Sequence, residues 1–287
     1  MSGIEGNKQY RNSVFCSYFN EPTRLLSLCN AILNTNYQDA GKLIINTLDG
    51  MFFDDQKNDI SCTIEDHFLV LIEHQTSVNE NMPFRCFSYA AELFNKLVED
   101  KNKLYRKSLI SFPAPRFVVL YDGDEAEPLE RIMKLSDAFC GDSSSLELIV
   151  TAYNINHGLE QELLKKCGYL GDYSTLVGKV KEGIKAGLTR RDAISKAVKF
   201  CIDNGFMKGF LEFHSEEVFN MLNLQWDKDT ALQARFDDGF DNGLEEGENR
   251  LAKLVALLLQ NGKTDEVQTA LHNSEKRNEL YKLYQIV

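Results

Sequence analysis

The 287 residues of the chain are 43% hydrophobic and 26% charged, a composition typical of a folded globular protein rather than a low-complexity or fibrous one. The net charge of −11 argues against a protein coated with basic residues for indiscriminate nucleic-acid binding, but it permits a local basic patch. No apolar run approaches the ~18 residues of a membrane-spanning helix, and the N-terminal MSGIEGNKQYRNS lacks the apolar core of a secretory signal. We therefore expect a cytoplasmic protein without membrane contact.

The first part of the chain, residues 1–160, is predicted to mix helices and strands. Apolar residues at helical spacing predict two helices within residues 11–35, the second beginning near Pro22. A longer amphipathic helix is predicted over residues 81–101, with Pro83 in its first turn. Runs of β-branched and apolar residues predict strands over residues 41–48, 59–64, 67–75, 116–123 and 146–156.

The remaining residues are predicted to be mostly helical. Residues 161–228 are expected to form a helical extension packed on the preceding part, and residues 229–287 an acidic linker and a helical tail. In the acidic stretch FDDGFDNGLEEGE, Gly239, Gly243 and Gly247 recur every four residues. Because glycine costs about 1 kcal/mol relative to alanine in a helix, this stretch is predicted to be a marginal helix or a linker.

Cysteines and nucleotide motifs exclude several classes of site. The seven cysteines are scattered and form no CxxC pair, which indicates buried, reduced thiols rather than a disulfide framework or a zinc site. Neither GxxxxGK[ST] nor GxGxxG occurs, so we expect no nucleotide cofactor.

One predicted strand, LVLIEHQ, ends in polar residues that need an explanation. Because side chains in a strand alternate between faces, Glu73 and Gln75 point the same way and His74 points the other way. Glu65 and Asp66 predict a tight turn to the preceding strand, which brings Asp59 opposite the end of LVLIEHQ. Asp59, Glu73 and Gln75 are therefore expected to cluster at one end of an antiparallel pair.

This cluster has the chemistry of a divalent-metal site. Two carboxylates at the edge of a low-dielectric core repel unless a cation lies between them, and hard oxygen ligands favour Mg²⁺ or Mn²⁺. We predict Asp59, Glu73 and the backbone carbonyl of His74 as metal ligands. Gln75 cannot titrate, so it can orient the attacking water but cannot act as the general base. Arg85 and Tyr89, four residues apart on the next predicted helix, are candidate contacts for a substrate phosphate.

Plainer interpretations stand beside these. Glu73 and Gln75 fit solvent-exposed residues at a strand end, and His74 fits a packed or surface histidine. The YDGD segment at 121–124 fits a turn after a strand better than a metal loop. The basic residues within 179–199 fit either a solvated helical face or a DNA contact.

The same residues resemble a known family. The pattern Asp…Glu-x-Gln across a hairpin is similar to that of the PD-(D/E)XK nucleases, in a variant with glutamine where lysine is usual. From about Arg11 to Trp226 the chain resembles the bacterial recombination-promoting nuclease and transposase-like family of that superfamily. IEHQTSVNENMPFR is the most distinctive segment, and the likeness extends to PAPRFVVLYDGDEAEP, KLSDAF and LELIVTAYNINHG.

The resemblance implies an α/β, restriction-endonuclease-like core: a small mixed sheet flanked by helices, followed by a helical extension. It implies a Mg²⁺-dependent DNA endonuclease that hydrolyses phosphodiester bonds, is linked to recombination or mobile elements, and uses Asp59, Glu73 and Gln75 for catalysis. A symmetric cut would use two active sites, so a homodimer is expected.

One departure from the family favours a different class of function. The family usually has aspartate where this chain has Asn12, which keeps an oxygen ligand but loses a charge. Together with the acidic net charge, this favours the alternative of a catalytically weak DNA- or protein-binding scaffold that retains the nuclease fold.

Overall fold

The computed structural model describes residues 14–46, 59–98, 100–141 and 145–286, which belong to two compact units, Met1–Gln225 and Trp226–Val287. Residues 161–228 were predicted as a helical extension packed on the preceding part. Two helices of that range, α4 (Glu162–Lys166) and α5 (Gly168–Lys185), pack against α2 (Pro22–Leu33). The predicted core and the predicted helical extension therefore form one unit. Among the described residues, no helix is both long and apolar enough to cross a membrane.

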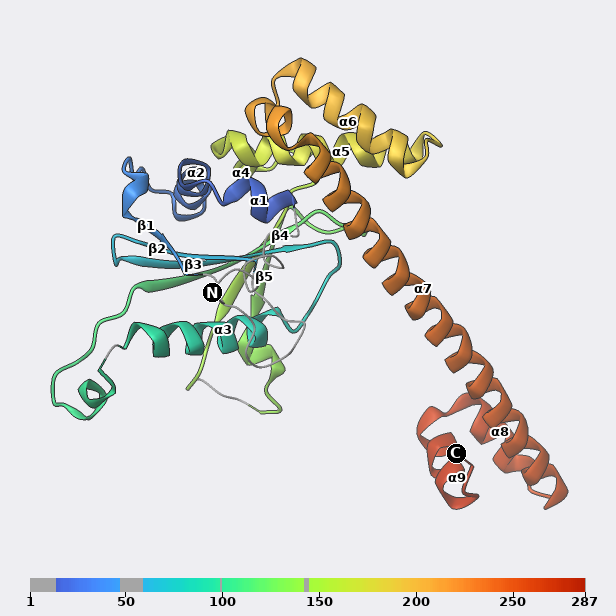
Figure 1. Ribbon diagram of the computed structural model, residues 1–287. Coiled ribbons are helices and arrows are strands. Elements are labelled where there is room, and N and C mark those ends of the chain that lie inside the picture. Colours follow the sequence, from blue (N-terminus) through green and yellow to red (C-terminus); the bar gives the residue numbers. More distant parts are fainter. Residues whose placement is uncertain (1–13, 47–58, 99, 142–144, 287) are drawn as a thin grey trace, which may run out of the picture. The chain divides into compact units, whose positions relative to one another are not determined.

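A six-stranded mixed sheet lies at the centre of the first unit (Figure 1), in the order β1-β2-β3-β4-β6-β5. β3 is parallel to β4 and β4 to β6, whereas the other neighbours are antiparallel. The strands are β1 (Leu43–Ile45), β2 (Ile60–Ile64), β3 (Phe68–Gln75), β4 (Ala114–Tyr121), β5 (Glu130–Lys134) and β6 (Ile149–Asn154). The mixed α/β class is thereby confirmed.

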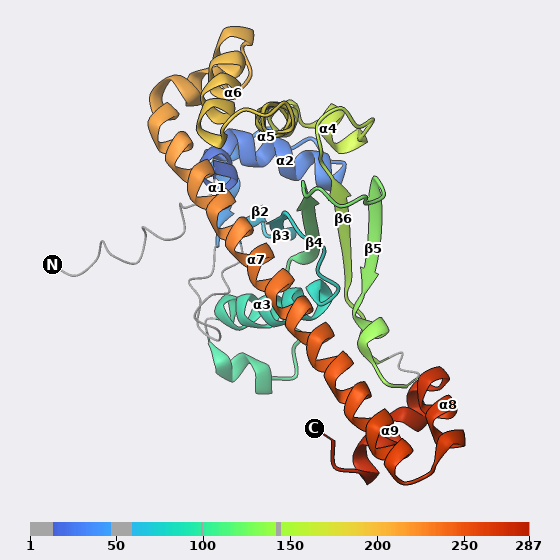
Figure 2. The ribbon, with the colours of Figure 1, turned by 90° about the vertical axis from the view of Figure 1, so that its right-hand side faces the viewer.

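Helices cover both faces of this sheet. α3 packs on one face, and α1, α2 and α5 lie on the other, as Figures 1 and 2 show. The helices of the first unit are α1 (Val14–Phe19), α2 (Pro22–Leu33), α3 (Met82–Leu97), α4 (Glu162–Lys166), α5 (Gly168–Lys185), α6 (Arg190–Asn204) and the start of α7 (Lys208–Gln260). Short 3₁₀ segments are η1 (Ala40–Lys42), η2 (Lys101–Tyr105) and η3 (Leu135–Ala138).

The helix starts follow the sequence signals. Pro22 occupies the first turn of α2, where its missing N–H costs nothing, and the Glu21 carboxylate accepts hydrogen bonds from the N–H groups of Thr23 and Arg24 at 3.0 Å. Pro83 lies in the first turn of α3 in the same way. The seven cysteines, all within the described ranges, form no disulfide, and only Cys140 is exposed, as the scattered spacing predicted.

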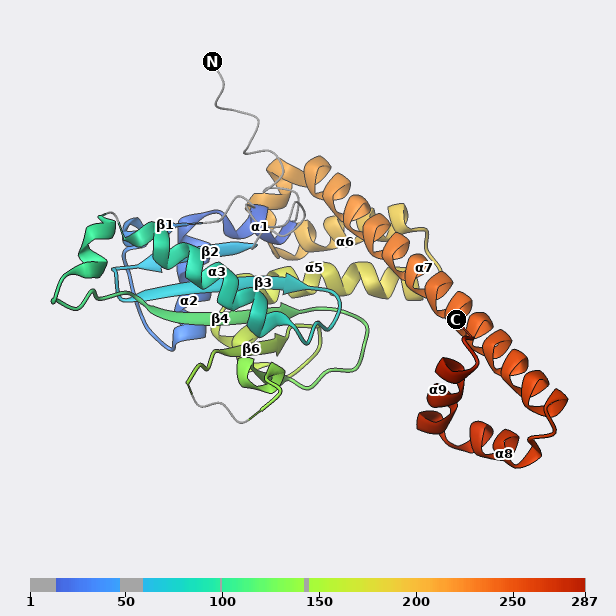
Figure 3. The ribbon, with the colours of Figure 1, turned by 90° about the horizontal axis from the view of Figure 1, so that it is seen from below.

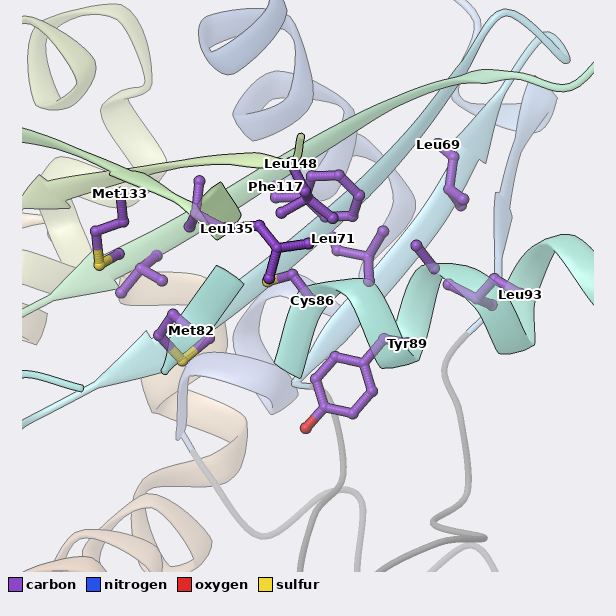
Figure 4. Close-up of a cluster of buried hydrophobic side chains, with 13 residues drawn as sticks. Leu69, Leu71, Met82, Cys86, Tyr89, Leu93, Phe117, Met133, Leu135 and Leu148 are labelled. Atoms are coloured by element: carbon purple, nitrogen blue, oxygen red, sulfur yellow. The ribbon is translucent and has the colours of Figure 1, made fainter. Parts of the chain in front are cut away.

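The core beneath α3 fixes the orientation of β3. Leu69 and Leu71 pack with Met82, Cys86 and Tyr89 of α3 (Figure 4), and the same cluster includes Leu93, Phe117, Val119 and Val150. Because alternate residues share a strand face, Glu73 and Gln75 continue the face that Leu69 and Leu71 bury against α3.

The β2–β3 hairpin differs from the prediction by one residue. Ile60 pairs with Ile72 and Ile64 with Phe68, so the turn is Glu65–His67 rather than Glu65 and Asp66 alone. Continuing this register places Asp59 opposite Glu73, at the end of β3 where the sequence predicted it.

The second unit has a core of its own. It consists of the end of α7, α8 (Thr264–His272) and α9 (Ser274–Leu283), whose ribbons Figure 3 shows from below. The buried residues that pack together are Leu254, Leu258, Val267, Ala270 and Tyr281. The tail thus contains three helical segments. The backbone of the glycine-containing stretch is helical within α7, because helix propagation between flanking helical residues outweighs the glycine propensity cost.

Candidate active site at the end of β2 and β3

The predicted alternation at the end of β3 is confirmed. Glu73, 3% exposed, contacts Arg85 of α3, and the Gln75 amide Nε2 lies 2.8 Å from the Met82 sulfur of the same helix. His74 points to the opposite face, where it contacts Tyr173 of α5. Glu73 and Gln75 thus share the α3 face of the sheet.

Asp59 is held at this site by the backbone of β3. Its Oδ2 accepts the His74 backbone N–H at 2.6 Å. Burial raises the pKa of Asp59, whereas the hydrogen bond from His74 and the charge of Arg85 act in the opposite direction. Because the N–H and C=O of one strand residue point to the same side, the His74 carbonyl faces the Asp59 side of β3, where a ligand oxygen was predicted.

The pKa of Glu73 is strongly raised. Burial and repulsion from the Asp59 carboxylate raise its pKa to about 8, and Arg85 opposes this shift. The Glu73 Oε2 lies 3.0 Å from the Arg85 Nη2. Its other oxygen, Oε1, is buried and has no hydrogen-bond partner among the described residues. Because burying a polar atom without a partner is costly, this oxygen is available to coordinate a cation.

Arg85 also has an unused group. Its Nη2 is shared between Glu73 and the Tyr89 hydroxyl, which lies 3.3 Å away. Its Nε is buried and lacks a partner within the described part of the chain. Arginine and carboxylate side chains commonly pair through two parallel N–H···O bonds. Here only one such bond forms, so Glu73 Oε1 and Arg85 Nε remain unpartnered. These two atoms can therefore serve a cation and an anion that bind together.

On the other sheet face, His74 has partners that the sequence did not reveal. Its Nε2 lies 2.9 Å from Asp122 Oδ2 and 3.2 Å from the Tyr173 hydroxyl, and its ring stacks on Phe15 with centroids 5.2 Å apart. The histidine is therefore packed rather than a surface residue. Asp122 belongs to the predicted YDGD turn, and β3–β4 pairing brings it beside the end of β3, because Gln75 pairs with Tyr121.

The donor set fits a hard divalent cation. The Asp59 and Glu73 carboxylates repel each other, and Glu73 Oε1 is unpartnered. Together with the His74 backbone carbonyl, they would supply oxygen ligands of the kind that Mg²⁺ prefers. Across the described ranges, no group of three or more His, Cys, Asp or Glu side chains is placed to hold a metal, so the set depends on the His74 carbonyl for a further oxygen. Asn12 lies outside the described residues.

Comparison with known proteins adds no family assignment to this geometry. No protein-family model matches the chain, and neither a curated protein nor a solved structure matches it.

Proposed function

We propose that the chain is a Mg²⁺-dependent DNA endonuclease of the PD-(D/E)XK type, with a restriction-endonuclease-like core. The observation that carries this proposal is the pair of half-buried Asp59 and buried Glu73, with an unpartnered Glu73 carboxylate oxygen, at the end of two paired strands. The proposal includes a link to recombination or mobile elements and a homodimer, which rest on the sequence resemblance alone. It also includes a cytoplasmic location, which rests on the amino-acid sequence.

Each residue has a role that its contacts support. Asp59, Glu73 and the His74 carbonyl would hold the ion, which when bound lowers the pKa of water and offsets charge on the phosphate; Mn²⁺ could replace Mg²⁺. Gln75 orients the attacking water by a hydrogen bond. Its present partner, the Met82 sulfur, is a weak acceptor, so the amide can exchange this contact for one with water. The free Nε of Arg85 donates to a substrate phosphate oxygen, and the Tyr89 hydroxyl keeps the guanidinium in place.

A specific observation also favours a scaffold without strong activity. Arg85 already gives Glu73 a positive partner at 3.0 Å, so the protein compensates part of the buried charge without a metal. A DNA- or protein-binding scaffold with this fold is therefore the second candidate.

A plasmid-nicking assay separates the two candidates. We expect nicking by the unaltered protein in Mg²⁺ or Mn²⁺ and none in EDTA. Asp59→Ala and Glu73→Gln should abolish it, since each removes a charged ligand. Gln75→Ala should slow nicking on the order of 10²-fold, the effect of losing one positioned hydrogen bond. Glu80→Gln, at an exposed glutamate, is the control and should nick normally. Equal nicking by the unaltered protein and Asp59→Ala would reject the nuclease.

A further inference from the structure

The segment that follows α3 combines positive charge with exposed apolar side chains. We call residues 101–109 the basic projection; in Figures 1 and 3 it extends outward from the end of α3. Its cationic residues are Lys101, Lys103, Arg106 and Lys107, all exposed. Tyr105 is 89% exposed and Leu109 is 94% exposed. In a chain with a net charge of −11, four cations within seven residues form a distinct positive surface.

The projection has a defined shape. The Asp100 carboxylate caps the 3₁₀ segment η2 by accepting the Asn102 N–H at 3.0 Å, and it lies 3.4 Å from the Arg106 guanidinium. Tyr105 and Leu109 therefore remain exposed although the backbone that carries them is ordered by a cap. Aromatic and aliphatic side chains held among cations are suited to a polyanion that also offers apolar contact surface.

The helix α3 leads from the candidate active site toward the projection. Arg85 lies in the first turns of α3 and Leu97 ends it, twelve residues later, which is about 18 Å along the helix axis. At about 3.4 Å per base pair, a B-form duplex covers this length in about five base pairs. The only acidic residue of α3 is Glu92, which is paired with Lys96 at 3.1 Å. The helix therefore offers duplex DNA a path without unpaired negative charge.

We propose that the basic projection is a second DNA contact, which grips the duplex about five base pairs from the cut. Lys101, Lys103, Arg106 and Lys107 contact backbone phosphates, and Tyr105 and Leu109 enter the minor groove, where apolar side chains commonly insert. The position of the cut rests on the proposed nuclease function, but the DNA contact does not.

The shape of the projection favours DNA over a lipid surface. Peripheral membrane binding usually requires a helix with a continuous apolar face, and η2 has only five residues. Binding to lipid vesicles is nevertheless included below as the competing outcome.

Salt-dependent DNA binding tests the proposal. The assay is fluorescence anisotropy with a 20-base-pair duplex, in Ca²⁺ to suppress cutting, across a salt series. Replacing the four cations by glutamine should reduce the slope of log K against log salt by about 3.6, since each phosphate contact contributes about 0.9. Tyr105→Ser with Leu109→Ser should weaken binding about tenfold with the slope unchanged, because it removes apolar contact but no charge.

Two controls make the result specific. Neutralising four exposed lysines elsewhere, Lys165, Lys208, Lys253 and Lys276, gives the same change in net charge and should alter the slope by less than one. Circular dichroism should show all variants folded, because the altered side chains are exposed. An unchanged slope in the four-cation variant would overturn the proposal, as would loss of binding to phosphatidylserine vesicles with DNA binding unaffected.

The outcome is separable from the nuclease question. Projection-dependent DNA binding by a protein that never nicks would remove the proposed function and keep the DNA contact. Nicking by a protein whose projection variants bind DNA with the same slope would do the opposite.

Discussion

Replacing Glu73 by glutamine should stabilise the metal-free protein at neutral pH. The pKa of Glu73 is raised from 4.5 to about 8, because burial and the Asp59 charge disfavour its ionised form. Below pH 4.5 the side chain is protonated in both folded and unfolded chains, so it imposes no cost. Between pH 4.5 and 8 the unfolded chain releases a proton that the folded chain keeps, and stability falls as the pH rises.

The size of the effect follows from this window. Each pH unit within it costs about 1.4 kcal/mol, so the cost is about 3 kcal/mol at pH 7 and on the order of 5 kcal/mol above pH 8. Glutamine has nearly the same shape and no charge, so Glu73→Gln should recover most of this free energy. At pH 7 the native glutamate is largely protonated, so the substitution removes little of the attraction to Arg85.

Urea unfolding followed by far-UV circular dichroism, in EDTA at pH 5, 7 and 8.5, measures the difference. Glu73→Gln should exceed the unaltered protein by under about 1 kcal/mol at pH 5 and by increasing amounts at pH 7 and 8.5. Glu80→Gln, at a side chain that is 67% exposed, should show no such trend. A Glu73→Gln difference that stays constant from pH 5 to 8.5 would refute the reasoning, since it would show that Glu73 ionises normally in the folded protein.

Four further predictions concern the site and the fold. Calcium affinity, measured by titration calorimetry, should rise up to about tenfold per pH unit until pH 8, because the ion must displace the Glu73 proton. Leu71→Ala should cost about 2–5 kcal/mol in urea unfolding, since Leu71 is 1% exposed beneath α3. Gly178→Ala should cost about 1–3 kcal/mol in the same assay, because its Cβ would lie 2.3 Å from His157 Cβ. A chain ending at Gln225 should remain folded, as judged by a cooperative unfolding transition in circular dichroism, and should resist proteolysis. The reason is that its core is separate from that of residues 226–287.

The sequence predicted what depends on local periodicity. The period of two in β3 placed Glu73 and Gln75 on one face and His74 on the other, and Pro22 and Pro83 marked two helix starts. Such features depend on neighbouring residues only, so a single sequence carries them.

Features that depend on distant pairing were not predictable. The strand β5 was missed because ERIMK buries only Met133 and is charged at Glu130, Arg131 and Lys134, as suits an edge strand. Asp122 and Tyr173 come close to His74 only because β3 is parallel to β4 and α5 packs on the sheet. The extra residue in the β2–β3 turn depends on the pairing register, which spacing alone leaves ambiguous by one position.

The contacts of His74 limit how far the chain can be truncated while the candidate site keeps its geometry. Its backbone N–H holds Asp59 while its imidazole meets Tyr173 of α5, and Lys181 of the same helix donates to the Asp122 carbonyl. A chain shortened to the sheet and α3 would keep every candidate catalytic side chain but lose the groups that brace the strand ends carrying them. The helices after residue 160 therefore cannot be treated as a detachable module, and grafting the site onto another scaffold would require their contacts as well.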